Sequence, residues 1–148
     1  MNRESIKGRW EVMSWEQLFD DGRKVLPMGE EIDGFREYSD YGMFCVISKK
    51  NREQFTTGGQ WSADDSEKPE AYSSYLTYAG SYDVDSNNDI VIHRIQQSIF
   101  PNWVGGNQYR SAKLDGDTLS LTTAKLEEGT TEARVSKLKF KRKVLKTL

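Results

Sequence analysis

The single histidine of this sequence, His93, is the side chain best suited to move a proton near neutral pH. It lies in the segment "IVIHRIQQSIF", where residues two and four positions apart share one face of an extended chain. We expect this largely apolar face to line an interior, with His93 and Gln97 as polar anchors for a ligand. The opposite face is also apolar at Ile90 and Ile92, so the alternation leaves the phase open.

Two roles for His93 are compatible with an interior position. As a general acid–base group it would transfer a proton within a bound substrate, and it is the candidate catalytic residue of the chain. As a structural residue it would be hydrogen-bonded to a neighbouring tyrosine, because a buried polar group needs a partner. The sequence keeps both roles open.

Arg110 and three tyrosines are further candidates for a ligand site. An interior arginine would bind a carboxylate or polarise a carbonyl, because its planar fork donates two hydrogen bonds at once; a surface salt bridge is the alternative. Tyr75, Tyr78 and Tyr109 would supply aromatic walls with a hydrogen-bonding tip. Tyrosines at helical spacing would equally serve to seat a helix on the rest of the fold.

The segment "SIFPNWVGGNQYR", residues 98–110, places large apolar side chains on a turn. Pro101 and the two glycines shape the turn, so Phe100 and Trp103 are held in position rather than mobile. They would cap one end of the fold or border the mouth of a ligand site. We expect the mouth, and count both residues among the ligand-binding candidates.

Several kinds of chemistry are not expected. One histidine and one cysteine, Cys45, cannot assemble a zinc site or an internal disulfide. The glycine pairs at 58–59 and 105–106 lack the lysine and helix of a phosphate-binding loop, and no serine has a nucleophile elbow around it. We therefore predict no cofactor and no metal.

Composition and charge limit the partners. With 36% hydrophobic and 30% charged residues the chain resembles a globular protein, and a net charge of −2 gives no reason to expect nucleic acid or an anionic membrane. No apolar run is long enough to span a bilayer, and no secretion signal opens the sequence, so a cytoplasmic location is expected. A homodimer stays open.

The elements that would position these residues are mostly strands, because apolar and polar residues alternate with a period of two. In the first strand Trp10 and Val12 share one face, and Met13 and Trp15 the other. Two short strands are expected around a turn at Ser39–Gly42. The predicted strands cover residues 9–18, 36–49 (as that hairpin), 52–61, 80–85, 89–100, 107–114, 118–126 and 132–143.

Residues 66–79 break this period. A capping Asp or Ser, early acidic residues, Pro69 near the start and Gly80 after the end predict one short helix.

Eight or nine antiparallel strands joined by hairpin-sized links, such as Asp115-Gly116-Asp117, favour an all-β barrel that closes on itself. An immunoglobulin-like sandwich is the rival, against which the lone cysteine and the run of adjacent hairpins weigh.

Several motifs resemble a known family. "IKGRW" is similar to the Gly-x-Trp opening of lipocalin and calycin barrels, while "EYSDYGMF", "YAGSYDVD" and "VIHRIQQSIFPNWVGGNQYRSAKLDGDTLSLTT" resemble the bacterial and fungal lipocalin-like domain family. The resemblance covers nearly the whole chain and implies a single domain, 1–148. It implies an up-and-down calycin barrel with the helix at one end. Trp10 would plug the closed end against an arginine of the last strand, Arg142 or alternatively Arg134.

Three functions follow, and the sequence does not decide whether the protein is an enzyme. The first is a barrel that binds a small, apolar or amphipathic molecule. The second, implied by the resemblance to lipocalin-like proteins of natural-product pathways, is a cofactor-independent isomerase or cyclase acting on a polyketide- or terpenoid-like intermediate. The third is an interaction protein whose barrel is filled by its own side chains.

Overall fold

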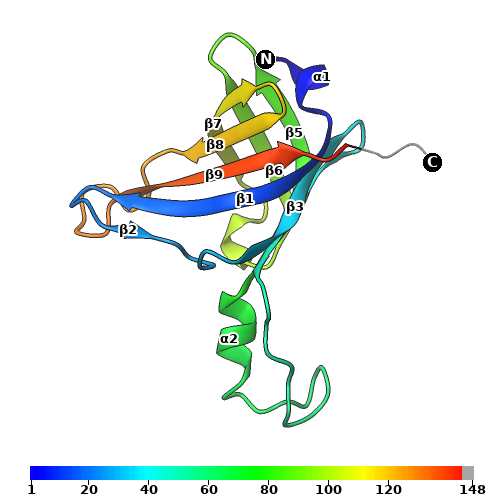
Figure 1. Cartoon of the computed structure of the whole chain (residues 1–148), viewed down its shortest axis with the longest axis vertical. Helices are drawn as coiled ribbons and strands as arrows, with labels where there is room; N and C mark the ends of the chain where they lie inside the picture. The colour runs from blue at the N-terminus through cyan, green and yellow to red at the C-terminus, as the bar shows by residue number, and fades with distance from the viewer. Residues whose placement is uncertain (145–148) are drawn as a thin grey trace.

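A computed structural model describes residues 1–144, and its main body is a closed antiparallel β-barrel (Figure 1). Consecutive barrel strands pair with one another, and the last pairs with the first, so the sheet closes. The short β2 (Lys24–Val25) is an additional strand beside β1. The predicted all-β, up-and-down barrel is confirmed. The eight barrel strands are β1 (Gly8–Phe19), β3 (Ile32–Ser39), β4 (Gly42–Lys49), β5 (Tyr75–Asp85), β6 (Ile90–Ser98), β7 (Asn107–Asp115), β8 (Thr118–Thr123) and β9 (Arg134–Arg142).

The one predicted helix is shorter in the structure, which also contains two short helices that the sequence analysis does not predict. The helices are α1 (Arg3–Ile6), α2 (Lys68–Ser73) and the 3-10 turn η1 (Pro101–Trp103). The helix predicted over 66–79 is wrong in its second half, where β5 begins at Tyr75 and pairs with β4. Leu76, Tyr78 and Tyr82 also alternate with period two, and the hydrogen bonds of an adjacent strand outweigh the helical spacing.

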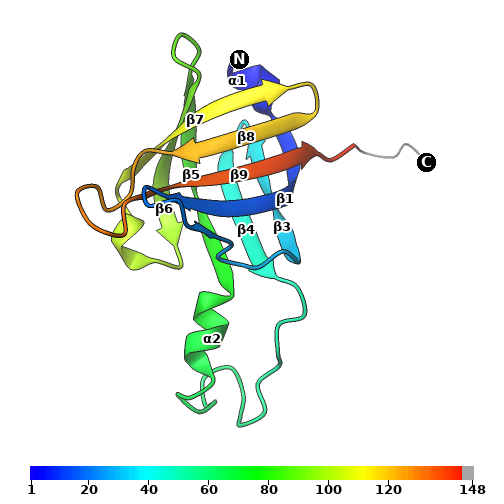
Figure 2. The ribbon, with the colours of Figure 1, turned by 60° about the vertical axis from the view of Figure 1, so that its left-hand side comes forward.

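The strand predicted over 52–61 is also wrong. This segment makes turns that are held by side chains, with both carboxylate oxygens of Glu67 accepting hydrogen bonds from Thr56 and Thr57. Together with α2 it forms an arm that extends away from one end of the barrel, as Figure 2 shows. Gly58 and Gly59 favour turns over a strand here, because glycine loses the most backbone freedom on ordering.

Two β-bulges reset which face of the chain points inward. In β1 the register with β9 shifts between Val12 and Ser14, so Met13 is the additional residue and is exposed. Trp10 and Trp15 therefore both face the interior, and the prediction that they lie on opposite faces is wrong. In β6 the register shifts between Ile95 and Gln97, opposite Ala79 and Gly80 of β5.

Gly80 makes the second bulge possible. A Cβ at this position would lie 1.8 Å from the carbonyl oxygen of Arg94 and 3.1 Å from the backbone nitrogen of Gln96. Only a residue without a side chain lets β5 approach the bulged strand so closely.

One end of the barrel is closed by Trp10. Its ring is fully buried, its Nε1 donates to the carbonyl of Ile6 over 2.9 Å, and the Arg142 guanidinium lies 4.1 Å above it. Arg142 also donates to the carbonyls of Lys7 and Ser5, both at 2.8 Å. The last strand is thereby tied to α1, and Arg142 rather than Arg134 is the partner of Trp10.

We predict that Trp10→Ala lowers the free energy of unfolding by about 3–5 kcal/mol, because it deletes a fully buried aromatic side chain. Urea denaturation measures this loss. Binding at the opposite end of the barrel should survive in the folded fraction. Unchanged stability with lost binding would mean that Trp10 belongs to the ligand site.

Gly80→Ala should cost at least about 2 kcal/mol of stability, because the backbone of β6 must move away from the new methyl group. Gly59→Ala is the matched control, since its Cβ would meet nothing closer than the Ser62 hydroxyl at 3.7 Å. It should change stability by no more than about 0.5 kcal/mol. Equal melting temperatures for both variants would contradict this account of the bulge.

Candidate ligand cavity

A cavity of about 270 Å³ lies inside the barrel, toward the end away from Trp10. Eight barrel or loop segments contribute to its wall, which is mainly apolar. The lining side chains are Trp15 and Gln17 from β1, Arg36 from β3, Leu76 and Tyr78 from β5, Trp103 from η1, Gln108 and Arg110 from β7, Leu121 and Thr123 from β8, Leu126, and Arg134, Ser136 and Leu138 from β9.

Trp103 borders this cavity, as expected for a mouth residue. Its ring packs edge-to-face with that of Tyr78, with the ring centres 5.6 Å apart and the planes at 90°. The Phe100 ring packs against it in the same way, also with 5.6 Å between the ring centres. The turn holds it there, since the Val104 N–H donates to the carbonyl of Pro101 and the Gly105 N–H to that of Ile95. The loop is thus anchored to the bulged end of β6.

Two buried arginines line the cavity wall. Arg36 is 2% exposed and Arg110 is 8% exposed. The Arg36 guanidinium lies 5.3 Å from the ring centre of Tyr78 and 5.2 Å from that of Phe140, and its Nε and Nη1 have no hydrogen-bond partner. Arg110 donates to the Gln108 side-chain oxygen at 2.9 Å and to its neighbouring carbonyl of Tyr109 at 3.2 Å.

His93 lies behind this cavity rather than on its wall. It is fully buried, and its Nε2 shares a hydrogen bond of 2.7 Å with the Tyr38 hydroxyl. Burial and the charges of Arg36 and Arg110 lower the pKa of His93 well below its ordinary value, so the imidazole is neutral at pH 7. Burial likewise raises the pKa of Tyr38, which stays protonated.

The predicted site residues separate into two groups. Arg110, Tyr78 and Trp103 line the cavity, and His93 is inside the barrel behind them. The bulge in β6 turns Gln97 outward to solvent, so the prediction that it shares the inner wall with His93 is wrong. The other three lie outside the cavity: Tyr75 stacks on Arg52, Tyr109 is exposed on the outer face of β7, and Phe100 reaches the site only through Trp103.

His93 and Arg110 do not face one another across the lumen. They lie on the neighbouring strands β6 and β7, where His93 is opposite Gln108 and Arg110 is opposite Val91. Both therefore belong to one wall of the barrel. A molecule in the cavity would meet Arg110 directly, while Nε2 of His93 is already engaged by Tyr38.

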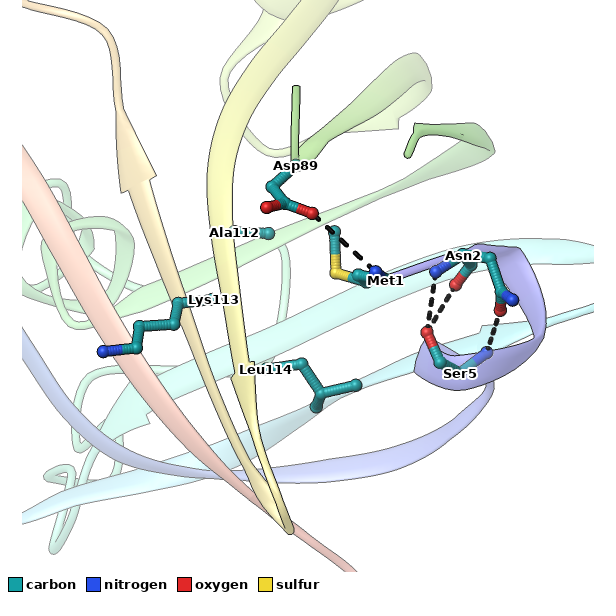
Figure 3. Close-up of a pocket in the computed structure, with 7 residues that line it drawn as sticks. All are labelled: Met1, Asn2, Ser5, Asp89, Ala112, Lys113 and Leu114. Carbon is teal, nitrogen blue, oxygen red and sulfur yellow. Dashed lines mark hydrogen bonds and ion pairs between the residues drawn. The ribbon is translucent and has the colours of Figure 1, made fainter. Parts of the chain in front are cut away.

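A second hollow lies at the closed end, between α1 and β7 (Figure 3). Several of its polar groups are already paired: Asn2 and Ser5 form a capping box, and the amino group of Met1 lies 3.8 Å from the Asp89 carboxylate. None of its side chains is among the buried polar atoms without a partner. The lumen cavity, where such atoms occur on Arg36, is the better candidate site.

Comparison with known proteins identifies the family. The sequence model described as the lipocalin-like domain matches residues 7–143. The chain belongs to the lipocalin-like domain family. It is also 35% identical over 68 residues to a protein of Aspergillus oryzae named 4'-hydroxy-3'-methoxypropiophenone carrier protein ppsC, and this alignment covers 42% of the chain and 61% of that protein. The match thus spans less than two thirds of the relative's length.

Sequence reasoning missed three interior residues of this lipocalin-like barrel: Trp15, Arg36 and Tyr38. The two-residue turn Asp40-Tyr41 pairs Arg36 with Cys45 and Tyr38 with Met43. That register could have shown that Arg36 and Tyr38 share a face with the apolar residues Cys45 and Met43 of the next strand. The opposite face of the same hairpin is also apolar, with Phe35 and Phe44 in contact on the outside, so the pattern gave no clear inner face.

Two properties of the described part of the chain complete the site description. Among residues 1–144, no helix is long and apolar enough to cross a membrane. In the same range, no three His, Cys, Asp or Glu side chains gather as a metal site would require.

The buried, neutral His93 predicts a pH dependence of stability. The unfolded chain protonates His93 below about pH 6.5 and the folded chain does not, so stability falls as the pH drops from 6.5 toward 5, by at most about 1.4 kcal/mol per pH unit. Urea denaturation of the native protein and of His93→Gln at pH 7 and pH 5 measures this. The variant should lose less stability than the native protein; an equal loss would show that His93 protonates freely in the folded state.

Proposed function

We propose that this lipocalin-like barrel is a carrier of a small, mainly apolar molecule with one polar end. The observation that carries the proposal is the lumen cavity itself, with aromatic and aliphatic walls and polar groups gathered on Arg36 and Arg110. Such a distribution suits a ligand whose body is desolvated and whose head forms directed hydrogen bonds. The name of the Aspergillus relative, a carrier of an aromatic ketone, agrees with it.

The size of the cavity limits the ligand. About 270 Å³ suits a molecule with one or two aromatic rings rather than a long lipid or a large macrocycle. Trp15, Tyr78 and Trp103 provide aromatic surface on different sides of the space. We infer that a flat, aromatic body fits it best.

The isomerase or cyclase alternative depends on His93 or a tyrosine meeting the bound molecule. His93 is not on the cavity wall, and its Nε2 is engaged by Tyr38. Tyr78 does line the cavity, but a lone tyrosine supplies one acid and no paired base. These observations favour binding over catalysis.

We place the carrier in the cytoplasm, in keeping with the buried free thiol of Cys45, and the homodimer stays a prediction.

The test uses 2-naphthoate and its methyl ester as aromatic probes, with binding measured by isothermal titration calorimetry. We expect at least one of them to bind with a 1:1 stoichiometry, and Leu76→Trp to weaken binding at least tenfold because it fills the cavity. Tyr75→Trp is the control: it adds a tryptophan at the neighbouring position, on the outer face, and should leave binding unchanged. If neither probe bound, or both variants behaved alike, the carrier proposal would fail.

A further inference from the structure

The charges inside the barrel define the head group of the ligand. Building on the proposed function, we propose that the molecule carried is an organic acid, ionised at neutral pH, whose anionic oxygens bind Arg36 and Arg110. A carboxylate is the simplest such group, and an acidic phenol or enol has the same chemistry. The body of the molecule would extend from these arginines toward Trp103 at the mouth.

The first support is that the two inner arginines lack a counter-charge. None of the described side chains that line the cavity is acidic, and neither Arg36 nor Arg110 takes part in an ion pair. Arg134, nearer the mouth, shows the contrast: it forms an ion pair with Glu127 and donates to the carbonyl of Glu132 at 2.9 Å. The interior therefore holds two positive charges that no acidic side chain of the described residues neutralises.

The second support is the hydrogen-bonding state of Arg36. Its Nε and Nη1 are buried without a partner, and its guanidinium lies over the ring faces of Tyr78 and Phe140. Ring faces attract a cation but do not accept its hydrogen bonds as an oxygen does. An anionic group beside Arg36 would supply both the charge and the acceptors.

The third support is the arrangement of Arg110. Gln108 and the carbonyl of Tyr109 already accept hydrogen bonds from its guanidinium, and these contacts hold it in place on β7. A neutral oxygen could accept hydrogen bonds from these arginines, but it would leave the charges of both uncompensated. Because an unpaired buried charge costs far more than an unpaired neutral group, an anion fits the site better than a ketone or an alcohol.

The experiment compares the two probes on the intact protein. 2-Naphthoate and methyl 2-naphthoate share one aromatic body, and only the first is ionised at pH 7. We expect the acid to bind at least tenfold more tightly than the ester. Arg36→Met and Arg110→Met should each weaken binding of the acid by about 10- to 100-fold, since each removes a charge-assisted interaction, and should leave ester binding within about threefold.

Two controls separate this mechanism from a general charge effect or a folding defect. Arg94→Met removes the same charge on the outside of β6, where Arg94 pairs with Asp83, and should leave both affinities unchanged. Ester binding by the Met variants shows that they are folded. Without ligand, Arg36→Met should melt at the same temperature or higher, because it removes an uncompensated buried charge.

The outcomes distinguish this inference from the carrier proposal. If the ester binds as tightly as the acid, or if the Met variants bind the acid normally, the anion site is refuted while the carrier proposal stands. Failure of both probes would refute the carrier proposal itself. A marked drop in the melting temperature of Arg36→Met, with its acid binding retained, would assign Arg36 to the stability of the barrel and overturn the inference.

Discussion

The pairing of β1 with both β3 and β9 is the constraint on which the rest of this structure depends. The first third of β1 bonds to β3, and nearly its whole length bonds to β9, which closes the sheet into a barrel. The bulge at Met13 lets one strand serve both neighbours while keeping Trp10 and Trp15 inside. One tryptophan seals the closed end, and the other lines the cavity.

Closure also explains why the interior can hold polar groups. A barrel of eight strands is wide enough to be filled by side chains or to keep a small ligand space. Here the end near Trp10 is filled, and the opposite half keeps about 270 Å³. Tyr38 and Nε2 of His93 are hydrogen-bonded to one another between the two regions, whereas Arg36 lacks hydrogen-bond partners on two nitrogens of its charged guanidinium. The folded state thus carries an electrostatic cost at the point where a ligand head group would relieve it.

The two inner arginines, Arg36 and Arg110, also affect the protonation of His93. Burial keeps His93 neutral, and the two arginines add to this effect because a third positive charge in the same interior would be unfavourable. The neutral imidazole of His93 is hydrogen-bonded to Tyr38 and does not line the cavity. These contacts suit a structural role better than proton transfer to a bound ligand. The position of His93 therefore agrees better with the proposed carrier function than with the isomerase or cyclase alternative.

The sequence by itself determined the fold class and the closed end, because period-two alternation, short hairpin turns and the Gly-x-Trp opening are local features. It also identified Arg110, Tyr78 and Trp103 as site candidates. Tertiary structure alone decided the rest. Two bulges, which depend on the register with a partner strand and on the close approach at Gly80, reversed the expected faces of Trp15 and Gln97. Arg36 became a cavity residue because pairing with the neighbouring strands selected one of two faces that both carry apolar residues. The sequence of a single strand does not specify that pairing.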